Sequence, residues 1–141
     1  MEKLIEFAGN HLVLVSLLAA ITAMLIWNLL GGAVSGIKQL TPAEVTRLMN
    51  RDDAILLDIR NGNDYKKGHI INSISLPNTE LAERLESLEK HKQKAVIAYC
   101  EHGNTSDKAA RTLKTSGFEN VYSLKGGVTA WRNANLPLTK D

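Results

Sequence analysis

The residues best suited to covalent chemistry lie in one short loop, which reads Cys100-Glu101-His102-Gly103-Asn104-Thr105-Ser106. Cys100 is the only cysteine in the chain, and a deprotonated cysteine is a strong nucleophile. The apolar run at 95–99 predicts a buried strand directly before Cys100, and a helix is expected about five residues after it. Ligand sites in open α/β sheets form at the carboxyl ends of strands, so we expect Cys100 to lie in a binding site.

The loop after Cys100 is expected to bind negative charge. A loop that contains Gly103 and leads into a helix turns several backbone N–H groups inward, next to the positive end of the helix. A free thiol is only about 3% ionised at neutral pH, and such a pocket stabilises its thiolate form. A lone cysteine is more often an inert part of the core, but this position favours a reactive thiol.

The surrounding sequence alternates patterns of strands and helices. Four short apolar runs predict strands, at residues 55–59, 73–76, 95–99 and 121–124. Capping residues and apolar spacing predict helices, one starting at Thr41, one over 79–90, one ending near Gly117 and one around Val128 and Trp131. The cluster Asn61-Gly62-Asn63-Asp64 is interpreted as a turn. This alternation is typical of α/β domains whose helices cover both faces of a mostly parallel sheet.

Residues 12–30 contain no charged side chain, and their apolar positions run all round a helix. A helix of this length rises about 28 Å, close to the roughly 30 Å hydrocarbon core of a bilayer. The sequence therefore predicts a transmembrane helix at 12–30. The other parts are a short N-terminal tail at 1–11, a Gly-rich linker at 31–36 and a soluble domain at 37–141. A cleavable signal peptide is the alternative, which the long apolar stretch and the weakly charged start disfavour.

The distribution of positive charge predicts the orientation of this helix. Lys38 and Arg47 follow the apolar segment, whereas Lys3 alone precedes it. This bias, together with a free thiol, places the soluble domain in the cytoplasm and the single-pass helix in the cell inner membrane.

Composition argues against other functions. The net charge is +2 and only 5% of residues are aromatic, so no concentrated basic surface for nucleic acid is expected. The four histidines and Cys100 show no metal-ligand spacing. We therefore expect no metal site and no nucleic-acid partner.

Four ordered motifs resemble those of the rhodanese family. They are Leu57-Asp58-Ile59-Arg60 with Asp64-Tyr65 and Gly68-His69-Ile70, the loop from Tyr99 to Ser106, Gly117 to Tyr122, and Leu124 to Trp131 with Leu136-Pro137. The resemblance covers the chain from Ile37 to Pro137. Many family members carry an anion-binding arginine where this chain has Thr105. In this respect the loop is similar to that of small single-domain thiosulfate sulfurtransferases.

The resemblance implies a rhodanese-like domain with a mostly parallel, five-stranded sheet flanked by helices. It implies that Cys100 takes a sulfane sulfur from a small anionic donor such as thiosulfate, holds it as a persulfide, and passes it to cyanide or a thiol acceptor. The thiol itself carries the sulfur, so no cofactor is required. The implied substrate-binding residues are Arg60, Glu101, His102, Gly103, Asn104, Thr105 and Ser106.

Two residue roles and one functional question stay open at this level. Arg60 either faces the pocket or pairs with Asp58 or Glu101 as scaffold, and His102 either contacts substrate or shapes the loop. The protein is either an active sulfurtransferase or a non-catalytic rhodanese-like module that recruits a protein partner at the membrane. The cysteine at the correct loop position favours the enzyme.

Overall fold

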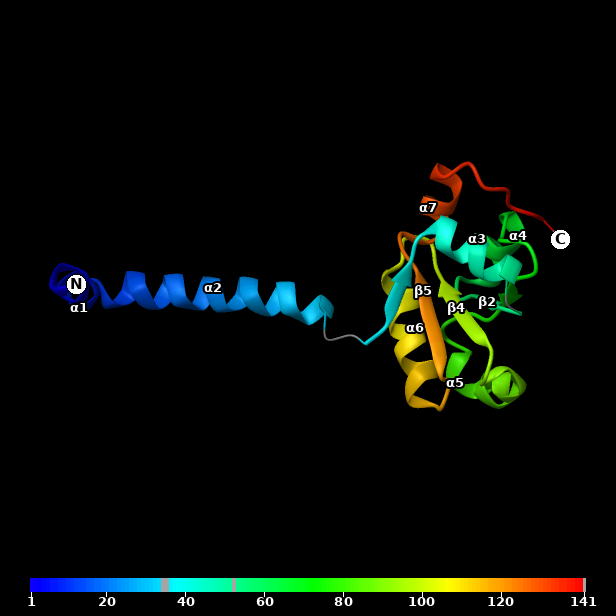
Figure 1. Ribbon diagram of the computed structural model, residues 1–141, viewed down its shortest axis with the longest axis horizontal. Coiled ribbons are helices and arrows are strands. Elements are labelled where there is room, and N and C mark those ends of the chain that lie inside the picture. The colour runs from blue at the N-terminus through cyan, green and yellow to red at the C-terminus, as the bar shows by residue number, and fades with distance from the viewer. Residues whose placement is uncertain (34–35, 52, 141) are drawn as a thin grey trace. The chain divides into compact units, whose positions relative to one another are not determined.

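The computed structural model describes residues 1–33, 36–51 and 53–140, and the chain forms two compact units, Met1–Gly36 and Ile37–Asp141 (Figure 1). The first unit contains helices α1 (Glu2–Asn10) and α2 (Leu12–Ala33). The expected tail at 1–11 is thus mostly helical. Helix α2 also continues through residues 31–33, where the linker is expected to begin, and residues 34 and 35 of that linker lie outside the described residues.

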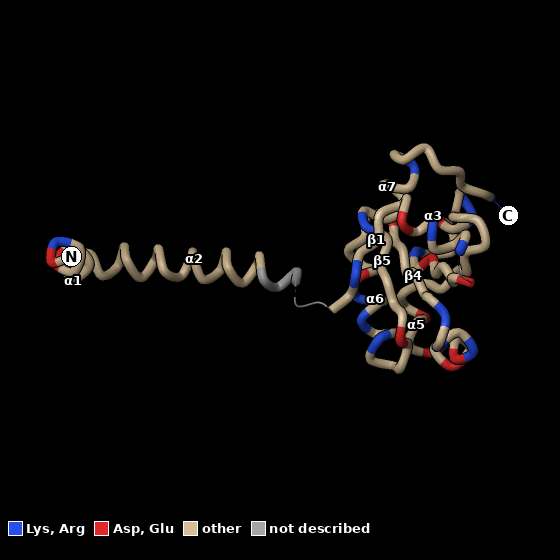
Figure 2. The backbone as a smooth tube through the Cα atoms, viewed as in Figure 1, with Lys and Arg blue, Asp and Glu red and all other residues tan. Residues whose placement is uncertain are grey.

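Helix α2 carries no charged residue over its described length, as Figure 2 shows. Its segment Leu12–Leu29 is long and apolar enough to cross a membrane, and none of it is buried within the structure. Trp27, near the end of this segment, is 82% exposed. A helix that is apolar all round is typical of a segment that is buried in a protein core or spans a membrane.

The second unit is built on a five-stranded sheet, which confirms the α/β fold expected from the sequence. The strands are β1 (Lys38–Leu40), β2 (Ile55–Asp58), β3 (Ile74–Ser75), β4 (Ala95–Tyr99) and β5 (Asn120–Leu124). Their order across the sheet is β1-β5-β4-β2-β3, and every pairing is parallel. Because all strands run the same way, their carboxyl ends meet at a single edge of the sheet.

Helices cover both faces of this sheet. The sheet separates the core into two apolar clusters, one on each face. Successive strand residues point to opposite faces, so Leu57 and Leu56 belong to different clusters. The cluster around Leu57 packs under α5 (Leu81–Arg84), the 3₁₀ helix η1 (Leu85–His91) and α6 (Asn104–Thr115). The cluster around Leu56 packs under α3 (Pro42–Arg51) and α7 (Gly127–Asn133). The central strands β4 and β5 are therefore held rigidly from both sides.

The two predicted helix caps are confirmed. The Thr41 N–H donates to Glu44 Oε2 at 2.8 Å, and the Glu44 N–H donates to Thr41 Oγ1 at 3.3 Å, which is a complete capping box. At the end of α6, Gly117 has a φ of 99°, and the next N–H, of Phe118, donates to Leu113 O at 3.2 Å. The start of α3 and the end of α6 therefore have the hydrogen bonds that the sequence predicts.

Two local predictions were wrong, and one strand was missed. The cluster at 61–64 is not a turn but the start of helix α4 (Gly62–Lys67), because Asn61 caps it by accepting the Asp64 N–H at 2.9 Å. The predicted helix at 79–90 is α-helical only over α5 and continues as η1, in which Leu85 and Leu88 share one side at a spacing of three. Strand β1 was not predicted at all.

Candidate active site

Cys100 lies at the edge where the carboxyl ends of three neighbouring strands meet. It directly follows β4, while Arg60 follows β2 on one side and Gly126 follows β5 on the other. Helix α6 begins at Asn104, close to the predicted position. The sheet topology thus brings together groups from the three segments that the sequence motifs identified.

The sulfur atom of Cys100 has two polar neighbours. The Gly103 N–H donates to Sγ at 3.0 Å, and Ser106 Oγ lies 3.5 Å from Sγ. Gly103 is the N-terminal cap of α6 and has a φ of 99°, a conformation that turns its amide toward the sulfur. Among the described residues this is the one backbone amide that hydrogen bonds Sγ, whereas several were expected. The cradle around the sulfur consists of one amide, one hydroxyl and the positive end of α6.

The N-terminus of α7 fixes the two peptide groups that directly follow Cys100. The Val128 N–H donates to Cys100 O at 2.9 Å, and the Thr129 N–H donates to Glu101 O at 3.1 Å. A Cβ at Gly127, whose φ is +60°, would lie 2.3 Å from Cys100 O, so a larger residue does not fit there. These bonds direct both carbonyls away from the sulfur. Sequence reasoning placed Gly126 and Gly127 only within the motif Leu124 to Trp131 and missed this role.

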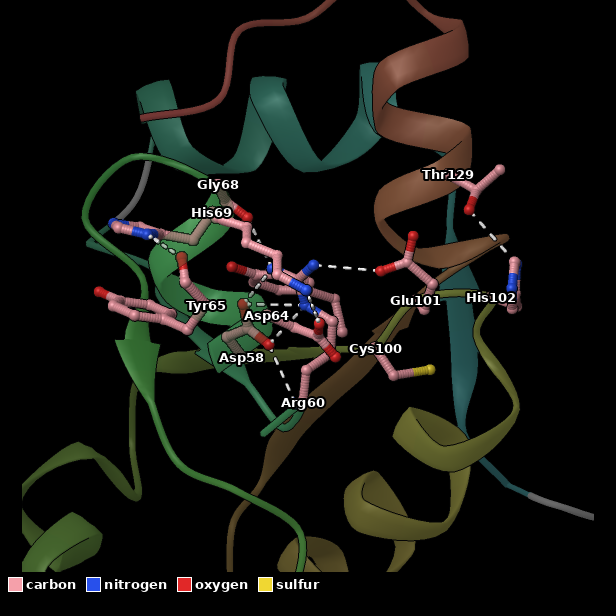
Figure 3. A network of polar contacts seen from close by, with 12 residues as sticks. Asp58, Arg60, Asp64, Tyr65, Gly68, His69, Cys100, Glu101, His102 and Thr129 are labelled. Atoms are coloured by element: carbon pink, nitrogen blue, oxygen red, sulfur yellow. Dashed lines mark hydrogen bonds and ion pairs between the residues drawn. The ribbon is translucent and has the colours of Figure 1, made fainter. Parts of the chain in front are cut away.

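Arg60 is held as part of the scaffold, the second of the two roles left open by the sequence. Its Nε donates to Asp58 Oδ1 at 3.0 Å, and its Nη2 donates to Asp58 Oδ2 at 2.7 Å and to Gly68 O at 2.8 Å. Its Nη1 donates to Glu101 Oε2 at 3.1 Å. Burial alone would lower the pKa of Arg60, but these carboxylates raise it above its ordinary value. In Figure 3 the sulfur of Cys100 points away from this network. Arg60 also lines the cavity described next, so its role as a substrate-binding residue stays a prediction.

A cavity of about 250 Å³ opens in front of the loop. Its lining includes most of the predicted site residues together with three that were not predicted, and consists of Ile59, Arg60, Asn61, Asp64, Cys100, Glu101, His102, Asn104 and Thr105. Gly103 and Ser106 are buried and do not line the cavity. Cys100 is buried, with 6% of its surface exposed, and belongs to this lining.

Glu101 and His102 connect the loop to its surroundings. Besides Arg60, the Glu101 carboxylate accepts a hydrogen bond from Arg132 of α7 at 2.9 Å. His102 is exposed, and its Nδ1 lies 3.3 Å from Thr129 Oγ1 (Figure 3). Each side chain therefore links the active-site loop to α7.

The two arginines beside Glu101 produce a pH-dependent contribution to stability. Burial raises the pKa of Glu101, but hydrogen bonds and charge attraction from Arg132 and Arg60 outweigh burial and hold the pKa below its ordinary value. The contribution is therefore complete above the unfolded-state pKa of about 4.3 and is lost as the pH falls through the folded-state pKa. We expect the free energy of unfolding of wild type to exceed that of Glu101→Gln near pH 7, and the difference to shrink below about pH 4.

Urea unfolding at several pH values measures this difference, with Glu83→Gln as the matched control. Glu83 is exposed and forms no ion pair among the described residues. A difference for Glu101→Gln that grows on acidification would contradict the assignment.

The fold and the site together define a class of protein: parallel α/β domains that carry a cysteine in the loop between a central strand and the following helix. Comparison with known proteins identifies the family. Residues 41–134 match the model of the rhodanese-like domain. The chain belongs to the rhodanese-like family.

Relatives of the chain differ in how much of it they match. The uncharacterised protein YibN of Escherichia coli strain K12 is 37% identical over 142 residues, covering 99% of both chains, so it matches both units. The thiosulfate sulfurtransferase GlpE of Pseudoalteromonas translucida is 39% identical over 97 residues, covering 69% of this chain and 90% of GlpE. Among solved structures, a rhodanese-related protein from Thermoplasma volcanium has a TM-score of 0.67 at 28% identity, covering 74% of this chain and 99% of its own. Sulfurtransferase activity is thus supported at the level of the family.

Proposed function

We propose that this protein is a membrane-anchored sulfurtransferase in which Cys100 carries a sulfane sulfur as a persulfide. The observation that carries this proposal is the hydrogen bond of 3.0 Å from the Gly103 N–H to the Sγ of Cys100, a residue that lines the cavity and lies just before the start of α6. A charge-assisted hydrogen bond and the helix dipole both stabilise a sulfur anion. The same environment suits the thiolate before the reaction and the persulfide after it.

The reaction consists of two displacements at sulfur. The Cys100 thiolate attacks the outer sulfur of thiosulfate, a new S–S bond forms, and sulfite leaves with the electron pair of the broken S–S bond. A thiolate acceptor then attacks the terminal sulfur of the persulfide, and Cys100 leaves as a thiolate. Each step conserves charge and electrons, and the protein returns to its starting state.

The cavity determines how an anionic donor would be held. Arg60 is bound to the carboxylates of Asp58 and Glu101, and Asp64 adds further negative charge to the lining. The first amides of a helix have no acceptor within the helix, so those of Asn104 and Thr105 are available to an anion. We infer that donor anions are bound by these amides and the Thr105 hydroxyl, and not by a guanidinium.

Intact-mass spectrometry of the detergent-solubilised full chain tests the activity. After incubation with thiosulfate we expect the mass to increase by one sulfur atom, located on Cys100 by peptide mapping. A thiol acceptor should remove this sulfur. If no sulfur is gained from thiosulfate or from a low-molecular-weight persulfide, the protein is a non-catalytic module that recruits a protein partner at the membrane.

We further propose that α2 spans the cell inner membrane once. Support comes from its length, its lack of charge and its full exposure within the structure. The full chain is expected to remain in the membrane pellet after washing with high salt and with carbonate at high pH. Release into the supernatant, or a mature protein that begins after residue 35, would contradict the anchor and indicate a signal sequence.

The same proposal places residues 37–141 on the cytoplasmic side. It is supported by Lys38 and Arg47 after the apolar helix, against Lys3 before it. Protease added to inverted inner-membrane vesicles should therefore degrade this domain, whereas protease added to intact spheroplasts should not. The opposite pattern would reverse the topology.

A further inference from the structure

Ser123 is a polar residue in an unusual place, on the central strand β5 beneath the active-site loop. Its side chain is completely buried, and its neighbour two residues earlier on the same face is the core residue Val121. Among the described residues, Ser106 Oγ is the one hydrogen-bond partner of Ser123 Oγ, at 2.9 Å. A buried hydroxyl without a partner is costly, so this single bond must satisfy Ser123.

The other bond of Ser106 constrains the direction of this bond. Gly103 O lies 3.0 Å from Ser106 Oγ and can only accept, so Ser106 donates its one hydrogen to that carbonyl. While Ser106 donates there, Ser123 is the donor in the bond to Ser106. Cys100 Sγ lies 3.5 Å from Ser106 Oγ, so in the thiol form of Cys100 the S–H can also donate to that oxygen. Ser106 is thus the central member of a buried chain that links Ser123 to the sulfur.

Ionisation of Cys100 changes which hydrogen bonds Ser106 and Ser123 must provide. The thiolate has lost its hydrogen, and stabilising it requires donors. Ser106 can turn its hydrogen from Gly103 O to Sγ, because the carbonyl of a helix cap also accepts the first bond of the helix and is not left unsatisfied. The hydrogen from Ser123 stays on Ser106 Oγ throughout. It holds that oxygen in place and makes Ser106 a stronger donor.

We propose that Ser123 is a positioning residue for sulfur transfer, acting through Ser106 to stabilise the anionic sulfur of Cys100. The proposal rests on the proposed function of Cys100. It assigns a role to a residue that lines no part of the cavity and does not touch the sulfur. The sequence carried a signal for it, a serine within an otherwise apolar strand.

The test is the variant Ser123→Ala in the full chain, with two measurements. We expect sulfur loading from thiosulfate to slow by about threefold to tenfold, as for loss of support to one charge-assisted hydrogen bond. We also expect the pH profile for alkylation of Cys100 by iodoacetamide to move to higher pH. A merely structural role would lower the unfolding temperature without moving this profile. Ser123→Thr, which keeps the hydroxyl, should restore the wild-type profile.

Ser73→Ala is the matched control, because Ser73 is also a buried serine but bonds the Tyr99 hydroxyl at 2.8 Å, in another part of the core. In a double-mutant cycle, Ser123→Ala should have no further effect in a Ser106→Ala background. A wild-type alkylation profile for Ser123→Ala, or for Ser106→Ala if the first variant does not fold, overturns the proposal. The alkylation profile needs no sulfur donor, so it remains decisive even if wild type fails to accept sulfur from thiosulfate.

Discussion

Replacing Cys100 by serine is expected to abolish sulfur transfer, lowering turnover by at least about a thousandfold. The serine keeps the shape of the side chain but cannot form a persulfide, and its hydroxyl is a far weaker nucleophile than a thiolate. Since Cys100 is the only cysteine, no other thiol can replace it. Release of sulfite from thiosulfate measures the rate, and intact mass measures the missing sulfur.

The control for this experiment is Thr112→Ala, a substitution on the exposed face of α6. It alters the same helix without touching the loop, and its turnover should equal that of wild type. Thermal unfolding of both variants should stay close to wild type. Wild-type sulfite release by Cys100→Ser would show that another group carries the sulfur.

Replacing Arg60 by methionine is expected to lower the free energy of unfolding by about 3–5 kcal/mol. The Asp58 side chain is completely buried, and the Arg60 side chain is only 5% exposed. Methionine retains much of the volume of the side chain but leaves the Asp58 carboxylate in the core without its ionic partner. The loss of a single partner from a buried pair costs far more than the pair contributes. Urea unfolding at neutral pH measures the effect.

Arg84→Met is the corresponding surface control. Arg84 pairs with Glu80 at 3.4 Å, and these side chains are 44% and 51% exposed. Exposed pairs contribute about 0–1 kcal/mol, so this variant should change stability little. Replacing both Asp58 and Arg60 by apolar residues should recover much of the loss. A cost below about 1 kcal/mol for Arg60→Met would show that Asp58 is not held by this ion pair.

The elements that could be predicted from the sequence are those whose structure depends mainly on their own residues. Residues 95–99 form a continuous apolar run, and a strand buried on both faces needs such a run. Strand β1 was missed because it has only three residues, two of them exposed, and it exists through pairing with β5. Such a strand forms because a neighbouring strand pairs with it, and the residues of the strand itself carry no pattern that predicts this pairing.

The same distinction applies to the site. The loop from Cys100 to Ser106 was predicted because its residue types and its position after a strand are local properties. The orientation of Arg60 depends on Asp58 two residues away and Glu101 on the next strand end, so the sequence left two alternatives. Ser123 and Gly127 come from a third segment, and their proximity to Cys100 follows from the pairing of β4 with β5. Contacts between distant segments required the three-dimensional structure.

The pairing of β1 with β5 has a consequence for biosynthesis. In this sheet β1, at the beginning of the second unit, pairs only with β5, close to the end of the chain. The domain therefore cannot complete its sheet until β5, at Asn120–Leu124, has been synthesised. Helix α2, by contrast, precedes every strand of the sheet and needs none of them to form. It can therefore be complete while the sheet, and the Cys100 loop that the sheet holds in place, are still unformed.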